Sequence, residues 1–122
     1  GMPEVARMVL RGSRMVFFSM GTKHHDLALM EVGPGAGDHD ATRIGLNHIA
    51  LKVGESLDEL REVDAHLQKH GIVPLRYSDH RVSQSIYLKD PDGITLELYV
   101  DAPPRIWAEN PAAVATANPL VL

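Results

Sequence analysis

The sequence contains no cysteine, which excludes disulfides, thiolate nucleophiles and thiolate metal sites. Aromatic residues make up only 5% of the 122 residues and hydrophobic residues 44%, so the core must be mainly aliphatic. No apolar run approaches the roughly 18 residues of a membrane span, and no signal peptide is visible at the start. We therefore expect one soluble, cytoplasmic domain with no membrane partner.

The charged residues are also not dominated by one sign. The formal net charge is -4 with histidine neutral, and acidic and basic residues are mixed along the chain without a basic stripe. Nucleic acid is therefore not an expected partner. Any bound metal must be held by nitrogen and oxygen atoms, which the seven histidines and sixteen carboxylates can supply.

The first third of the chain contains little regular pattern. Residues 15–20 are apolar and aromatic and predict a buried strand, with room for one short strand before them. Residues 25–32 predict a second strand that pairs back on the first. A flexible linker of glycine, proline and aspartate follows over residues 33–40. We interpret residues 1–44 as a partial first module with its linker.

A regular pattern begins after the linker. Residues 46–53 predict a strand. Ser56 and Glu59 form a capping box, which predicts the start of a helix, and Gly71 predicts its end. The apolar residues between them recur at helical spacing and are Leu57, Leu60, Val63 and Leu67.

Three further strands are predicted over residues 72–77, 83–88 and 94–100. The sequence Asp-Pro-Asp-Gly at residues 90–93 predicts a tight turn between the last two. The resulting order is βαβββ over residues 45–101, which predicts the α+β class. The tail that follows, residues 102–122, cannot form one long helix because it contains four prolines.

Two strand residues carry side chains that can bind a metal. Glu97 lies on the face opposite the apolar residues of its strand, so alternation alone favours a solvent-facing or Lys/Arg-paired carboxylate. His48 alone is best interpreted as a hydrogen-bonded core histidine. If the first and last strands of the module lie side by side, however, His48 and Glu97 can converge on an Fe(II), Mn(II) or Zn(II) ion.

Three other polar residues can be interpreted either as structural or solvated, or as functional. His25 either belongs with His24 to a solvated pair or points inward from the start of a strand. His80 and Tyr87 are either a loop histidine and a half-buried tyrosine, or a proton carrier and a hydrogen-bond partner for a bound oxygen. We expect the remaining histidines to be structural or solvated; they are His39, His66 and His70.

Residues 80–97, HRVSQSIYLKDPDGITLE, resemble the signature of the extradiol ring-cleavage dioxygenases. These enzymes belong to the vicinal-oxygen-chelate group, together with glyoxalase I and the bleomycin and fosfomycin resistance proteins. GLNHIAL at residues 45–51 resembles the opening strand of this family, and HDLAL at residues 25–29 resembles the end of the preceding module. The resemblance runs from about residue 14 to residue 101, with several motifs in the right order.

The resemblance implies a role for each matching residue. His48 and Glu97 are metal ligands, and His25 is an acid–base group near dioxygen. His80 donates a hydrogen bond, and Tyr87 contacts an oxygen of a catecholic substrate. The implied cofactor is Fe(II), with Mn(II) or another divalent metal as alternatives, and the implied substrate is a small aromatic diol.

One departure from the family concerns the third metal ligand, a histidine on the first strand of the earlier module. No histidine precedes His24 in this chain. Three explanations stay open: a truncated sequence, an element supplied by a second chain, or a degenerate relative that binds no iron. We expect a homodimer that covers the exposed sheet. The alternatives to a dioxygenase are a non-catalytic binding module and a glyoxalase-like isomerase or resistance protein.

Overall fold

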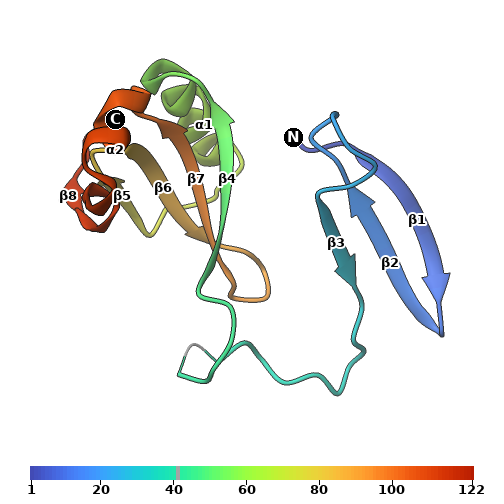
Figure 1. The fold of residues 1–122 in the computed structure, drawn as a ribbon. Helices are drawn as coiled ribbons and strands as arrows, with labels where there is room; N and C mark the ends of the chain where they lie inside the picture. Colours follow the sequence, from blue (N-terminus) through green and yellow to red (C-terminus); the bar gives the residue numbers. More distant parts are fainter. Residues whose placement is uncertain (41) are drawn as a thin grey trace. The chain divides into compact units, whose positions relative to one another are not determined.

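The computed structural model describes residues 1–40 and 42–122 (Figure 1). The chain divides into two compact units, residues 1–37 and residues 38–122, and each is described by itself. No helix in the described part of the chain is long and apolar enough to cross a membrane.

The first unit is a three-stranded antiparallel sheet in the order β1-β2-β3. Its strands are β1 (Glu4–Leu10), β2 (Ser13–Phe18) and β3 (Leu27–Met30). Arg11 and Gly12 join β1 to β2 with φ values of 52° and 87°, as expected for a two-residue hairpin loop whose central residues both have positive φ. The sequence predicted one short strand before residue 15, and the structure contains a strand of seven residues there.

The predicted strand at residues 25–32 is shorter in the structure and begins at Leu27. The reason is the Asp26 carboxylate, whose Oδ2 atom accepts hydrogen bonds from the Met20 N–H (2.7 Å) and the Ser19 hydroxyl (3.3 Å). These bonds hold the preceding residues in a compact connection between β2 and β3. His25 therefore lies in this connection and not in the strand.

The second unit has the predicted βαβββ order, and the predicted α+β class is confirmed. Its elements are β4 (His48–Gly54), α1 (Leu57–Lys69), β5 (Arg76–Asp79), β6 (Ser83–Lys89) and β7 (Thr95–Asp101). The first and last of these strands, β4 and β7, pair in parallel, whereas β7, β6 and β5 pair antiparallel. Strands from opposite ends of the module therefore become neighbours.

The proline-rich tail forms three short elements, which Figure 1 shows in orange and red. They are α2 (Pro104–Glu109), a 3₁₀ helix (Pro111–Ala115) and β8 (Asn118–Pro119). The last of them pairs antiparallel with β5, which gives a five-stranded sheet in the order β4-β7-β6-β5-β8.

The predicted capping signals of α1 operate at both ends of the helix. The Ser56 hydroxyl accepts a hydrogen bond from the Glu59 N–H (3.3 Å), and Glu59 Oε2 accepts one from the Glu55 N–H (2.7 Å). At the other end Gly71 has a φ of 72°, a left-handed conformation that favours glycine. The Ile72 N–H then donates to the Leu67 carbonyl at 2.9 Å and closes the last turn.

That closing bond also explains an error in the predicted strand at residues 72–77, because β5 begins only at Arg76. The Ile72 amide is already bonded to the helix, and Pro74 has no amide hydrogen to give to a neighbouring strand. Regular pairing with β6 starts when Leu75 donates its N–H to the Tyr87 carbonyl (2.7 Å).

The core lies between α1 and one face of the sheet. Its buried members come from the helix and from β6 and β7, and they are Leu60, Leu67, Ile86, Leu88 and Val100. Because side chains alternate along a strand, the intervening residues of these strands lie on the opposite face. That opposite face carries Tyr87 and Glu97, two of the polar residues that the sequence singles out.

The helix is also tied to the sheet by one polar contact, in which the Tyr77 hydroxyl donates to Asp64 Oδ1 at 2.8 Å. Burial, together with the Asp64 carboxylate, raises the pKa of Tyr77 above its usual value. The neutral phenol is therefore favoured by folding, so this stabilisation is complete below pH 10 and is lost as pH rises through the raised pKa.

We expect Tyr77→Phe to lower the free energy of unfolding by about 1 kcal/mol at neutral pH, because one hydrogen bond is lost. The native protein should lose stability above pH 10 more steeply than the variant. Urea unfolding at pH 7 and in the alkaline range measures both effects. Equal unfolding midpoints at pH 7 would contradict the assigned contact.

Candidate functional site

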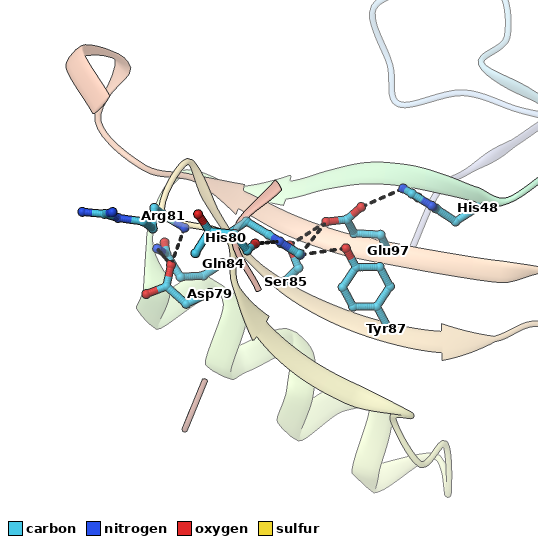
Figure 2. Close-up of polar contacts among 9 residues, drawn as sticks. His48, Asp79, His80, Arg81, Gln84, Ser85, Tyr87 and Glu97 are labelled. Carbon is cyan, nitrogen blue, oxygen red and sulfur yellow. Dashed lines mark hydrogen bonds and ion pairs between the residues drawn. The ribbon is translucent and has the colours of Figure 1, made fainter. Parts of the chain in front are cut away.

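A histidine and a glutamate meet on the sheet face opposite α1 (Figure 2). The parallel register places Ala50 of β4 opposite Glu97 of β7, so His48 lies two residues along the same face. His48 Nε2 is 3.0 Å from Glu97 Oε2. Glu97 is only 8% exposed, so the simple interpretation of a solvent-facing or Lys/Arg-paired carboxylate is wrong. The cause is the β4–β7 pairing, which alternation within one strand cannot reveal.

The second oxygen of Glu97 is held by a serine. The Ser85 hydroxyl of β6 donates to Glu97 Oε1 at 2.7 Å, and Ser85 is completely buried. The Glu97 carboxylate is thus fixed from both sides by polar groups, as a buried charge requires. The sequence analysis did not select Ser85 for the site, although it shares the strand face of Tyr87 two residues further along.

His80 is positioned by the tight connection between β5 and β6. The Arg81 N–H donates to Asp79 Oδ1 at 2.7 Å, and the His80 N–H donates to the Ser83 carbonyl at 2.9 Å. Arg81 has a φ of 67°, an uncommon conformation for a residue with a side chain. These contacts place the His80 ring beside the sheet face, where its Nε2 lies 4.0 Å from Glu97 Oε1.

The hydrogen bonds of His80 define its tautomer. Its Nδ1 bonds to the Thr116 carbonyl oxygen in the tail, and a carbonyl can only accept. Nδ1 therefore carries a hydrogen, and in the neutral ring Nε2 is the acceptor. The Tyr87 hydroxyl, 2.9 Å from Nε2, then donates to it. His80 and Tyr87 thus form a linked pair next to Glu97.

Tyr87 is itself buried, with 4% of its surface exposed. Burial raises the pKa of Tyr87, the Glu97 carboxylate adds to this rise, and Arg76 opposes it. The Arg76 guanidinium lies 3.9 Å from the centre of the Tyr87 ring and makes a cation–π contact with it. The phenol therefore stays protonated at neutral pH and can donate a hydrogen bond.

The geometry of His48 and Glu97 fits a divalent metal ion. Adjacent atoms that bind one ion at about 2.0–2.2 Å lie about 3 Å apart, which agrees with the 3.0 Å between His48 Nε2 and Glu97 Oε2. Imidazole and carboxylate together suit Fe(II), Mn(II) and Zn(II). Over residues 1–40 and 42–122, no group of three His, Asp or Glu side chains is arranged to hold an ion. The metal-binding role of His48 and Glu97 stays a prediction.

The remaining selected residue, His25, belongs to the first unit. Its ring packs edge-on against Phe17, with 5.2 Å between the ring centres, and its Nδ1 is 2.6 Å from that of His24. Its catalytic role stays a prediction. The other histidines at first judged structural or solvated, His39, His66 and His70, are exposed.

Residues 1–98 match the family model described as Glyoxalase/Bleomycin resistance protein/Dioxygenase superfamily. The chain belongs to this superfamily. The match covers the first unit and residues 38–98 of the second, with both residues of the His48–Glu97 pair. The expected membership of the vicinal-oxygen-chelate group is thereby confirmed.

Two curated proteins that are similar to this chain are named as dioxygenases. A catechol-2,3-dioxygenase from Bacillus subtilis (strain 168) is 41% identical over 66 residues, which are 54% of this chain and 22% of that protein. A biphenyl-2,3-diol 1,2-dioxygenase from Rhodococcus globerulus is 32% identical over 97 residues, which are 79% of this chain and 50% of that protein. The chain thus spans half or less of the length of these relatives.

Two solved structures share the fold. A glyoxalase/bleomycin resistance protein/dioxygenase domain from Frankia sp. EAN1pec has a TM-score of 0.70 and 22% identity, over 83% of this chain and 79% of that chain. A fosfomycin resistance protein from Listeria monocytogenes has a TM-score of 0.59 and 21% identity, over 83% and 74% of the two chains. At these identities the likeness supports the fold alone.

The Ser85→Ala variant tests whether the Ser85 hydroxyl orients the Glu97 carboxylate. Because Ser85 holds one oxygen of the proposed metal-binding carboxylate, its loss should weaken Fe(II) binding by about 10- to 100-fold. Fe(II) titration of the variant under anaerobic conditions measures this change. Ser83→Ala is the matched control, since it removes a hydroxyl from the same strand and is expected to keep the native affinity. Unchanged binding in Ser85→Ala would show that this hydrogen bond does not orient the ligand.

Proposed function

We propose that this protein binds Fe(II) through His48 and Glu97 and takes part in the oxygen-dependent ring cleavage of a catecholic aromatic. The observation that supports this most strongly is the convergence of four residues, of which three lie on one sheet face and His80 lies beside it. His48 lies 3.0 Å from Glu97, and the His80–Tyr87 pair lies on the other side of the same carboxylate. The names of the curated relatives agree with this chemistry.

Each residue has a distinct task in this proposal. When bound, Fe(II) supplies the redox chemistry that allows dioxygen to react with an electron-rich diol. Tyr87, held protonated by its raised pKa, donates a hydrogen bond to a substrate oxygen. His80 accepts the hydrogen of the Tyr87 hydroxyl in the resting arrangement and can exchange a proton with it. His25 is proposed as an additional acid–base group.

The test is to load the protein with Fe(II) anaerobically, add catechol, and then admit isotopically labelled oxygen. Ring cleavage should consume one O₂ per diol and place both labelled atoms in the ring-opened product. Tyr87→Phe should lower the rate while iron content stays the same. Iron-loaded protein that never opens a catechol ring in air would reject the proposal.

A second function, a non-catalytic binding module, is supported by the incomplete ligand set. In the described residues the His48–Glu97 pair is not joined by a third metal-binding side chain. Tight uptake of one iron per chain would argue against this alternative. Activity on thiol conjugates but not on catechols would instead favour a glyoxalase-like isomerase.

We also propose that the protein is a homodimer. The β4 strand lies at the edge of its sheet, since the order is β4-β7-β6-β5-β8. An open edge offers backbone groups to another strand, and natural proteins usually cover it. Light scattering after gel filtration should give twice the chain mass. A monomer that still binds one iron per chain would show that a second copy is not needed to complete the site.

A further inference from the structure

Two exposed histidines, His66 and His70, lie one turn apart at the C-terminal end of α1. Side chains four residues apart on a helix are neighbours, and the centres of these two rings are 4.3 Å apart with 39° between their planes. The helix covers the sheet face opposite the His48–Glu97 site (Figure 1). The two rings therefore form a second cluster of metal-binding side chains, separate from the proposed iron ligands.

The hydrogen bond of the His70 ring leaves its other nitrogen ready to bind an ion. His70 Nδ1 is 2.8 Å from the His66 carbonyl oxygen, which can only accept, so Nδ1 carries the hydrogen. In the neutral ring Nε2 then has the free lone pair. Histidines that bind metals almost always donate their other N–H to a carbonyl, a carboxylate or water. His70 therefore already has the tautomer and the outer hydrogen bond of a metal ligand.

The spacing of the two rings indicates which ions fit. An imidazole nitrogen binds an ion at about 2.1 Å, so the ring centre lies about 3.2 Å from the ion. Two rings at right angles around the ion then have centres about 4.5 Å apart, whereas a tetrahedral angle would require about 5.2 Å. The observed 4.3 Å agrees with the right angle. Right-angled nitrogen ligands suit Cu(II) and Ni(II), whose geometry is square-planar or tetragonal.

The surroundings of the pair also favour a cation. The C-terminal end of a helix carries a partial negative charge from its last carbonyl groups. Glu62 lies one turn before His66 and offsets the charge of Lys69 in the last turn. The chain contains no cysteine, so no thiolate competes for the ion. In the part of the chain that the structure describes, no third side chain is arranged to join the pair, so water fills the remaining positions around the ion.

We propose that His66 and His70 form a surface chelate for Cu(II), with Ni(II) bound more weakly at the same place. Cu(II) binds nitrogen ligands more tightly than the other divalent ions of its row, and Fe(II) stands low in this order. The pair is therefore not expected to compete for iron. Because both ligands come from the end of α1, the bound ion holds the last turn of the helix closed. The inference is independent of the proposed function.

Cu(II) titration of the metal-free protein tests the proposal by calorimetry and electron paramagnetic resonance. It is made at about pH 7.5, because imidazole binds metals in its neutral form. The first equivalent of Cu(II) should show coupling to two nitrogen atoms. His66→Ala and His70→Ala should each weaken its binding by about 100-fold, because the second imidazole is held at a high effective concentration by the same helix. Native affinity in both variants would overturn the proposal.

A change of spacing separates chelation from the number of histidines. The double variant Gln68→His/His70→Ala retains two histidines on α1 but places them two residues apart, where side chains do not face each other. Gln68 is exposed, so the helix should tolerate the change, which circular dichroism checks. The double variant should bind Cu(II) as weakly as His70→Ala. Binding with native affinity would show that the spacing is irrelevant, which overturns the chelate.

Two more variants test the other pairs of metal-binding side chains. His24 Nδ1 and His25 Nδ1 are 2.6 Å apart and hydrogen-bond to each other, so these two nitrogens are already used. His24→Ala should therefore retain the two-nitrogen signal. Glu97→Ala should retain it as well while losing Fe(II), which would show that the two metal sites are independent. Loss of the Cu(II) signal in either variant would place the ion in that other pair and overturn the inference.

Discussion

Glu97→Ala is expected to abolish Fe(II) binding and leave the fold intact. Glu97 supplies one of the two proposed ligand atoms. Loss of a residue that only hydrogen-bonds to a metal ligand weakens metal binding by up to roughly 100-fold, so loss of Glu97 should weaken Fe(II) binding by more than that. The side chain points away from the α1 core, whose members are aliphatic. Metal analysis after anaerobic loading, together with circular dichroism, measures the two effects separately.

Two further variants make this result specific. Glu97→Gln retains the shape of the side chain and can still accept from the Ser85 hydroxyl, yet it removes the negative charge that a cation needs. It should also lose iron. His66→Ala, on the exposed side of α1, should bind iron normally. If Glu97→Ala unfolds the protein, Glu97 is a structural residue and the metal assignment loses its main support.

Leu60→Ala is expected to have the largest effect on stability. Leu60 is completely buried at the centre of the aliphatic cluster, beside Ile86 and Val100, which are 0% and 1% exposed. Removing a buried leucine side chain costs about 2–5 kcal/mol through lost burial and the cavity that remains. Whole domains are stable by only about 5–15 kcal/mol, so a large part of the stability should disappear. Urea unfolding gives the change directly.

Leu75→Ala provides the matched control, because it makes the same chemical change at a residue that is 58% exposed. Its effect should stay below about 0.5 kcal/mol. Similar losses in the two variants would mean that Leu60 does not occupy the centre of the core.

The regular half of the chain could be predicted well because its signals are local. Ser56, Glu59 and Gly71 define α1, and Asp90 to Gly93 form the tight turn before β7, where the Gly93 N–H donates to the Asp90 carbonyl. Boundaries failed where a backbone group was already bonded elsewhere. One example is the Ile72 N–H, which bonds to the helix, and the other is the Met20 N–H, which bonds to the Asp26 carboxylate. Each of these bonds shortens a predicted strand.

The candidate site could be predicted only in part. Alternation indicated the faces of His48 and Glu97. The burial of Glu97, however, depends on which strands are neighbours in the sheet, and the sequence of a single strand does not show this. Ser85 and Thr116 were missed for a related reason. Nothing in the sequence indicates that a serine in a strand will bond to Glu97, or that a backbone carbonyl in the tail will bond to His80.

The parallel pairing of β4 with β7 has a consequence for cooperativity. The two proposed ligands come from opposite ends of the module, and His48 is the first residue of an edge strand. Opening of that edge would separate the ligands while the hydrophobic cluster stays closed. An ion that binds only the closed form must then slow amide hydrogen exchange along β4, by an amount set by its concentration and affinity. The ion would thus stabilise the paired state of β4, the strand that carries His48.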